Sequence, residues 1–327
     1  MPRHTLKAAV KRGALLAAAN WQVTLIQASA DSLYKLLLAA PIIGGVFLVA
    51  LAIGSEPETL ITLESREMAT TIVSSLLSQP VVLAAFLLAV AVVGVGGSLF
   101  VFLVKAGTVS TLVRSDRETS TIEEGTLHVE LVARAGRFST DAYIESARAL
   151  FPRYARLGFI LMAVYLASGA AYLLAVVNRL GEGWGLTALI TILFVAWITL
   201  VNLLYLLVQI VMTADDCGVA SAARRVAAFV RHARRDVFSV FLLVFALIVA
   251  ATGASVLATA ALGLVAFVPF FGLAALPLQL LAWLLRGLVF QYLGLTSIGA
   301  YLKLYRTTGG DNFLEGRLKP APTYGMS

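Results

Sequence analysis

Hydrophobic residues fill six long stretches of the chain, and polar residues gather between them. The apolar stretches lie at 33–54, 80–104, 157–177, 186–212, 237–262 and 273–302. A bilayer core about 30 Å thick is crossed by roughly 20 apolar residues in a helix. Each stretch reaches that length, so the pattern predicts an all-α integral membrane protein with six transmembrane helices.

The composition supports this reading. Of the 327 residues, 60 % are hydrophobic and only 13 % are charged, and the mean hydropathy is +0.90. Soluble domains are usually about 45–50 % apolar and about 25 % charged, so the excess apolar surface must face lipid. A single cysteine, Cys217, cannot form an intramolecular disulfide. With only three histidines beside it, the chain is expected to hold no metal and no cofactor.

The basic residues mark one side of the membrane. Of the 25 Lys and Arg residues, 22 lie in four segments: 1–35, 105–156, 213–236 and 303–327. Segments 54–79 and 179–185 hold one each, and segment 263–272 holds none. Basic loops stay cytoplasmic, so both termini are predicted inside, in a multi-pass protein of the bacterial inner membrane. The net charge of +7 then reflects topology and anionic lipid headgroups, and no nucleic-acid partner is expected.

Amphipathic basic segments precede the odd-numbered spans. In residues 224–235, Val226, Phe229 and Val230 recur at helical spacing opposite the arginines. Such helices lie in the headgroup layer with their basic side chains on lipid phosphates, or they offer a docking surface to a cytoplasmic partner. The predicted lipid- or partner-facing residues are Arg148, Arg153, Arg156, Arg224, Arg225, Arg231, Arg234 and Arg235.

Small residues recur at four-residue spacing within the spans. Such stripes let helix backbones approach closely in lipid. The predicted packing residues are Ala163, Ala167, Ala171 and Ala175 in the third span, Ala246, Ala250, Ala254 and Ala258 in the fifth, and Gly94 with Ser98 in the second. The third and fifth spans therefore share both a basic prelude and an alanine stripe, which indicates a repeated unit.

The repeat predicts three helical hairpins, each introduced by an amphipathic interfacial helix. The predicted divisions are an interfacial segment 1–32, a first hairpin 33–104, a cytoplasmic loop with an amphipathic helix 105–156, a second hairpin 157–212, an Arg-rich helix 213–236, a third hairpin 237–302 and a tail 303–327. Within the loop, EEGTLHVELVARAG alternates polar and apolar residues, which is typical of a strand or short hairpin.

The passage TADDCGVASAARRVAAFVRHARRDVFSVFLL combines Asp215 and Asp216, a short Ala-rich helix, arginines and the next span. This order, with three hairpins and Arg-rich preludes, resembles six-helix bacterial membrane proteins, and it is similar to the membrane domain attached to some glycerophosphoryl diester phosphodiesterases. The resemblance covers about residues 140–300. It implies the six-helix fold and no catalytic residue, and no soluble α/β stretch that could carry a phosphodiesterase activity is present.

Arg286 is the most informative polar residue of the spans. It lies about midway along the sixth span, too deep to reach either surface easily, and no acidic residue lies at similar depth. Its partners are then neutral groups such as Asn202 or Gln291, backbone carbonyls, a lipid headgroup or an anionic substrate. Gln209 lies on the same face as Asn202. Arg286, Asn202, Gln209 and Gln291 form the candidate intramembrane polar site, in either a functional or a structural role.

Two connections carry open alternatives. Residues 263–277 hold no charge but contain Pro269, Gly272 and Pro277, which fits a re-entrant segment or a tight hairpin. Asp215 and Asp216 are expected to form a solvated turn or to cap the helix that begins near Ser221, with cation or partner binding as the alternative.

No nucleophile–base pair, paired carboxylates or ligand cluster is placed for catalysis. We therefore expect a non-enzymatic accessory or scaffold subunit that binds membrane lipids and other membrane protein subunits. The alternative is a permease-type component that moves an anionic or amphipathic solute past Arg286 and works with a separate ATPase, since the chain has no ATP-binding motif.

Overall fold

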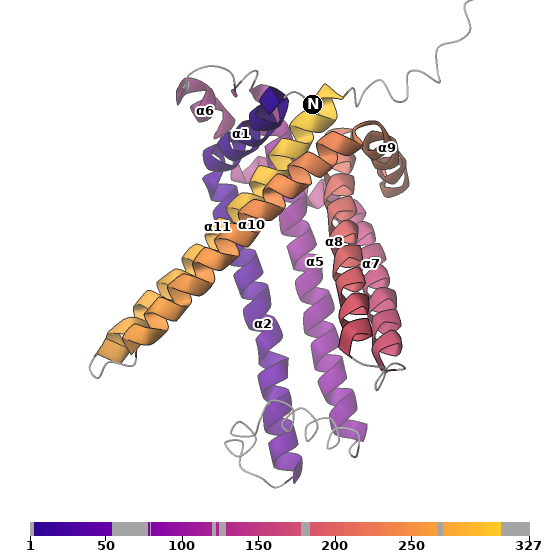
Figure 1. Cartoon of the computed structure of the whole chain (residues 1–327), viewed down its shortest axis with the longest axis vertical. Coiled ribbons are helices and arrows are strands. Elements are labelled where there is room, and N and C mark those ends of the chain that lie inside the picture. Colours follow the sequence, from indigo (N-terminus) through magenta and orange to yellow (C-terminus); the bar gives the residue numbers. More distant parts are fainter. Residues whose placement is uncertain are drawn as a thin grey trace, which may run out of the picture. The chain divides into compact units, whose positions relative to one another are not determined.

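The computed structural model describes residues 3–53, 78, 80–119, 122–123, 129–177, 184–266 and 271–308. These residues are almost entirely helical, and no strand occurs among them. The helices are α1 (Arg3–Ala19), α2 (Trp21–Ile53), α5 (Pro80–Glu118), α6 (Val129–Ala135), α7 (Thr140–Val177), α8 (Trp184–Ala214), α9 (Val219–His232), α10 (Arg234–Ala266) and α11 (Phe271–Thr307) (Figure 1).

Five of the described helices are long and apolar enough to cross a membrane: α5, α7, α8, α10 and α11. They coincide with the second to sixth predicted spans, so the chain is a multi-pass helical membrane protein. The predicted first span lies in α2, but most side chains beyond Gly45 are outside the described residues, and this span stays a prediction.

The chain separates into two compact units. The first comprises Met1–Ala28 and Lys105–Ser327, and the second comprises Ser29–Val104. In the second unit, the ring of Tyr34 packs over Gly97, and its hydroxyl lies 3.5 Å from the Ser98 hydroxyl. Gly94 has no neighbour within 4 Å of the position a Cβ would take. Of the two packing residues predicted here, only Ser98 therefore makes an observed helix contact.

The buried core of the first unit lies at one end of its long helices. Fully buried side chains include Leu16 of α1, Met212 of α8, Phe229 of α9 and Tyr301 of α11. In α7, α8, α10 and α11 the described buried residues lie within 143–158, 205–214, 237–244 and 295–305. These are the ends next to the basic segments. The remaining length of each helix presents apolar side chains outward, as expected for surfaces in contact with lipid.

Helix α1 is part of this core, and its predicted position in the headgroup layer stays a prediction. It crosses α11 at Gly13 and Gly299. A Cβ at Gly13 would overlap the Thr296 carbonyl oxygen, and one at Gly299 would lie 2.7 Å from the Gly13 Cα. The Tyr292 hydroxyl donates to the Ala14 carbonyl at 3.1 Å. Two glycines at one crossing let the backbones touch, so α1 packs directly on protein.

The 105–156 segment is more helical than predicted. Helix α5 continues to Glu118, and α7 already begins at Thr140. The predicted strand or hairpin is wrong for its described part, because Val129–Ala135 forms helix α6. His128 lies outside the described residues. The alternating pattern was misleading because it covers only seven residues. Over so short a segment, apolar side chains at Val129, Leu131 and Val132 can also lie on one side of a helix.

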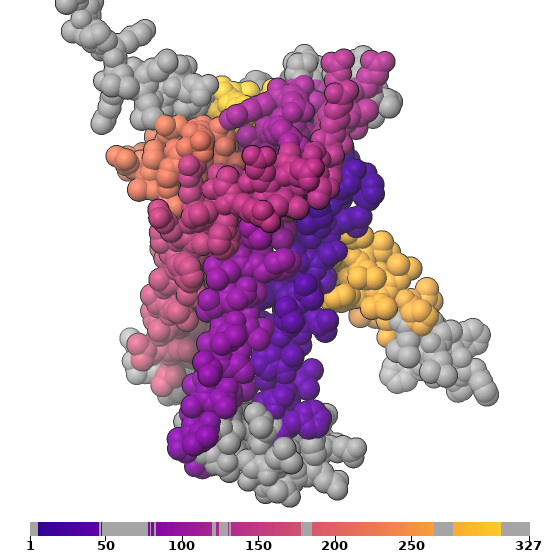
Figure 2. Space-filling view, turned by 180° about the vertical axis from the view of Figure 1, so that it is seen from behind, coloured from indigo at the N-terminus to yellow at the C-terminus, as the bar shows by residue number. Residues whose placement is uncertain are grey.

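Helix α9 is amphipathic as predicted, but its apolar face is covered by protein. Ala222, Val226 and Phe229 are buried against neighbouring helices, and α9 contacts α7, α8 and α10. In Figure 2, the orange surface that includes α9 lies against the pink surface at one end of the long helices. The ring of Phe229 meets that of Tyr305 edge-on, with centroids 5.3 Å apart. Arg224, Arg231, Arg234 and Arg235 remain exposed. The basic surface is therefore held in place by the protein fold, and its contact with lipid headgroups or a partner stays a prediction.

Helix α10 extends to Ala266, and α11 begins at Phe271 and runs through Pro277. The two helices lie against each other, as do α7 and α8. Residues 267–270 of the predicted re-entrant or tight connection lie outside the described residues.

Candidate functional site

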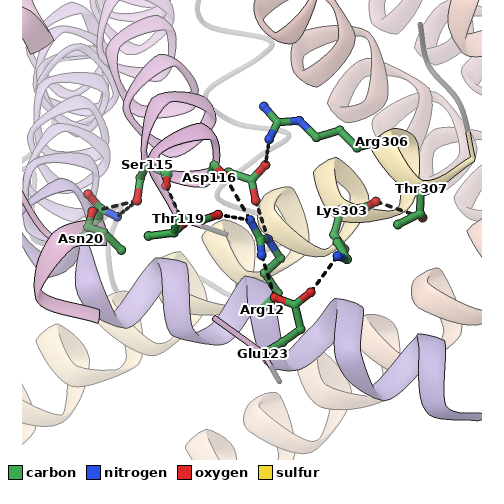
Figure 3. A network of polar contacts seen from close by, with 10 residues as sticks. Arg12, Asn20, Ser115, Asp116, Thr119, Glu123, Lys303, Arg306 and Thr307 are labelled. Carbon is green, nitrogen blue, oxygen red and sulfur yellow. Dashed lines mark hydrogen bonds and ion pairs between the residues drawn. The ribbon is translucent and has the colours of Figure 1, made fainter. Parts of the chain in front are cut away.

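A network of buried charges joins three parts of the first unit (Figure 3). Arg12 of α1 is only 4 % exposed. Its Nε donates to Asp116 Oδ1 at 2.5 Å, and one terminal nitrogen donates to Glu123 Oε2 at 2.6 Å. The other terminal nitrogen donates to the backbone carbonyls of Asp116 and Thr119 at 3.0 and 2.9 Å. The planar guanidinium fork makes this four-way contact possible.

Helix α11 completes the network. Lys303 Nζ lies 2.7 Å from Glu123 Oε1, and Arg306 forms an ion pair with Asp116 Oδ2. Each of the four carboxylate oxygens of Asp116 and Glu123 therefore faces a basic group. Because each oxygen faces a basic group from another segment, the cluster is suited to holding these segments together.

A chain of neutral groups extends the network toward α6. Asn20 Nδ2 donates to Ser115 Oγ at 3.2 Å, and Ser115 Oγ donates to the Ala135 carbonyl at 2.7 Å. Thr119 Oγ1 donates to the Ser115 carbonyl at 2.7 Å. The end of α5 is thereby bonded to α1, to the turn before α2 and to α6.

The buried contacts shift the pKa values of Glu123 and Arg12. Burial by itself would raise the pKa of the Glu123 carboxyl, but the hydrogen bonds from Lys303 and Arg12 outweigh it and leave the pKa below its ordinary value. Burial by itself would lower the pKa of Arg12, and the charges and hydrogen bonds of Asp116 and Glu123 raise it instead. Both groups are therefore held in their charged forms at neutral pH.

Sequence analysis missed this network. It treated Lys and Arg at both ends of the chain as markers of topology, and it assigned no role to Asp116 or Glu123. Asp116 and Glu123 are two of seven acidic residues in segment 105–156, which also holds eight basic residues, so composition does not single them out. The partners lie more than 100 residues from Arg12 in sequence, so no local spacing could have identified them.

A second polar cluster surrounds the turn between α8 and α9. Asp215 accepts hydrogen bonds from Arg225 and, at 2.7 Å, from the Tyr305 hydroxyl. Asp216, at φ 45°, pairs with Arg153 of α7. The predicted helix cap is not observed, since α9 begins at Val219 after Gly218 and has no side-chain cap. The two aspartates tie the turn to α7, α9 and α11 instead.

Arg286 lies in a groove of about 640 Å³ between α10 and α11. The guanidinium is 5.7 Å from the centre of the Phe290 ring, one turn further along α11. Within the described part of the chain, no carboxylate lies within 4 Å of Arg286. The polar side chains that share the groove are Ser255, Thr259 and Gln279.

The other predicted members of the polar site lie elsewhere. Asn202 Oδ1 accepts a hydrogen bond from the Tyr165 hydroxyl of α7 at 2.5 Å. Gln209 is buried near the basic end of α8, at 2 % exposed. Gln291 is half-buried on α11. Among the described residues, no hydrogen bond or ion pair joins these three to Arg286, and none of the three lines the Arg286 groove.

The alanine stripes have different surroundings. Ala254 and Ala258 of α10 line the Arg286 groove, while Ala246 and Ala250 are exposed. In α7, Ala163, Ala167 and Ala171 are exposed and Ala175 is half-buried. The α7–α8 contact uses another face: Trp197 Nε1 donates to Ser168 Oγ at 2.9 Å, and the Tyr172 ring stacks on Phe194 at 4.4 Å. No contact described above uses these alanines to join two helices. Their role in helix packing therefore stays a prediction.

No three His, Cys, Asp or Glu side chains in the described part of the chain are placed to hold a metal ion. Comparison with known proteins adds no assignment: no family model, curated protein or solved structure matches the chain. Its class therefore rests on its own features, which are long apolar helices joined at one end by a buried ion-pair network.

Proposed function

We propose that this protein is a non-catalytic accessory or scaffold subunit of a membrane complex and that the α10–α11 groove receives a transmembrane helix of its partner. The observation that carries the proposal is Arg286, a charged side chain in a predicted span with no carboxylate within 4 Å in the described part of the chain.

The cost of this arginine supports the proposal. A charged side chain near the bilayer centre costs about 3 kcal/mol on insertion scales unless it meets a counter-charge or water. The ring of Phe290 provides a cation–π contact, but a neutral ring does not balance the charge. An aspartate or glutamate on a partner helix at the same depth would do so.

The groove also suits a helix by shape. Ala251, Ala254, Ala258 and Gly263 of α10 are small residues that line it. In lipid, small residues let two backbones approach and gain van der Waals contact. The charge of Arg286 and the small residues of the groove therefore favour one kind of occupant, an apolar helix that carries one acidic residue.

We place the protein in the bacterial inner membrane with six spans in three hairpins and both termini cytoplasmic. The distribution of basic residues supports this orientation. The buried core and the Arg-rich α9 then lie on the cytoplasmic side, where α9 can meet anionic lipids or a soluble partner. The likeness to the membrane domain of some glycerophosphoryl diester phosphodiesterases remains part of this proposal.

The alternative is a permease-type component that works with a separate ATPase. Ser255, Thr259 and Gln279 beside Arg286 favour it, because they offer hydrogen bonds to an anionic or amphipathic solute. The same groove would then be a path past the arginine.

Site-specific crosslinking in cells tests the proposal. A photoreactive residue replaces Ala254 in the groove or, as a matched control, Leu257, which is 73 % exposed on α10. We expect a discrete polypeptide adduct from position 254 that is absent from position 257. Arg286→Leu should abolish it, and Arg224→Leu, which removes a charge from exposed α9, should retain it.

Purification in mild detergent with mass spectrometry then identifies the crosslinked protein. A membrane protein with an intramembrane acidic residue supports the scaffold. An ATPase that copurifies with wild type, together with loss of solute transport in Arg286→Leu, would favour the permease. Adducts to lipid only, or a polypeptide adduct unchanged in Arg286→Leu, would refute the groove as a helix-binding site.

A further inference from the structure

A second groove, of about 730 Å³, lies between α7 and α8 and is bordered at one end by the start of α9. Its walls are mainly apolar and include Ile160, Leu161, Val164, Val201, Leu204 and Val208. Both α7 and α8 are candidate membrane spans. An apolar groove along two such helices is accessible to the acyl chains of surrounding lipids.

The end of the groove that α9 borders is also basic. Arg153 and Arg156 border it from α7, where the predicted third span begins. Arg153 is paired with Asp216, whose side chain is 81 % exposed. Arg156 is exposed, and no carboxylate in the described part of the chain lies within 4 Å of it. One arginine therefore offers its full charge at the mouth of an apolar groove.

The first turn of α9 adds polar groups at the same place. Gly218, Val219, Ala220 and Ser221 border the groove. No side chain caps this helix end, and its first turn holds no acidic residue. Backbone N–H groups there lack intrahelical acceptors and carry partial positive charge. They supplement the arginine, which provides the main attraction for an anion.

We propose that this groove is a binding site for an anionic phospholipid. One acyl chain lies along the apolar walls between α7 and α8, and the headgroup phosphate meets Arg156 and the start of α9. Charge complementarity and the order of surfaces, apolar along the spans and basic at their end, select this occupant. The proposal is independent of the Arg286 groove, which lies between α10 and α11.

The test uses the full chain in lipid nanodiscs that contain phosphatidylcholine with or without phosphatidylglycerol. Native mass spectrometry counts phosphatidylglycerol molecules that remain bound after release into the gas phase. We expect one retained molecule on wild type and about fivefold weaker binding for Arg156→Gln, the effect of one basic residue near a lipid surface. Arg148→Gln, which removes an exposed charge from the same helix outside the groove lining, should bind as wild type does.

A second pair of variants tests the apolar part. Val164→Trp should fill the groove and reduce retention, whereas Leu166→Trp, at a position 68 % exposed on α7, should not. Thermal unfolding verifies that each variant is folded. Inorganic phosphate at millimolar concentration should not displace the lipid if the acyl chain contributes to binding.

Three results would overturn the proposal. Equal lipid retention by Arg156→Gln and Arg148→Gln would show that the headgroup is not held here. Displacement of the bound phosphatidylglycerol by inorganic phosphate alone would show that the site binds a free anion and not the acyl chain. A dimer of this chain that is lost specifically in Val164→Trp would identify a second copy as the occupant.

Discussion

Arg12 Nε lies 2.5 Å from Asp116 Oδ1, which ties the first helix of the chain to the end of α5, 104 residues later. Glu123, Lys303 and Arg306 extend this contact to α11. Buried charges on helix ends fix which ends meet, because a displaced helix would leave an unpaired charge out of water. The network therefore specifies the arrangement of the first unit.

Removing Arg12 should destabilise the protein strongly. Arg12→Met leaves two buried carboxylates without their shared partner and should lower the free energy of unfolding by about 3–5 kcal/mol. Lys7→Met, at an exposed position of the same helix, should have little effect. Denaturant unfolding of both variants in detergent measures the difference. Equal stability of the two would show that Arg12 is not a structural tie.

Stability should fall at acidic pH through Glu123. Its folded pKa lies below the ordinary value of 4.5, so its charged form stabilises the folded protein above pH 4.5. That contribution is lost as the pH falls below 4.5 toward the folded pKa. Tm measured from pH 7 to pH 3.5 should fall more steeply in wild type than in Glu123→Gln. Parallel curves would contradict the assignment.

The α1–α11 crossing should not tolerate a side chain. Gly13→Ala places a Cβ onto the Thr296 carbonyl oxygen and should cost about 3 kcal/mol, since neither backbone can move without losing contacts. Gly169→Ala is the control, because the position lies in α7 with nothing within 4 Å. A helical glycine in open space is expected to gain stability on this change. Thermal unfolding compares the two, and a Gly13→Ala protein as stable as wild type would refute the close crossing.

The proposed orientation is open to a labelling test. In a Cys217→Ser background, Ser65→Cys lies in the segment predicted outside and Thr308→Cys in the tail predicted inside. A membrane-impermeant thiol reagent added to intact cells should label position 65 at once and position 308 only after permeabilisation. The reverse pattern would overturn the prediction that both termini are cytoplasmic.

The hydrophobic pattern alone predicted a multi-pass helical membrane protein. It also predicted the five helices of the described residues that are long and apolar enough to cross a membrane. A transmembrane helix satisfies its own backbone hydrogen bonds, so its signal is a local run of apolar residues. The amphipathic character of α9 was predictable for the same reason, since helical spacing places Val226 and Phe229 on one face.

Tertiary structure decided what those elements contact. It placed α1 on α11 through Gly13 and Gly299, covered the apolar face of α9 with protein, and left Asn202 out of the groove that holds Arg286. It also assembled Arg12, Asp116 and Glu123 into one network. These are contacts between distant segments, and their energies depend on which helices meet, which no local pattern of residues encodes. The sequence by itself determined where the helices lie, because in lipid each apolar segment must satisfy its own backbone hydrogen bonds. Packing among the helix ends determined which helices contact one another.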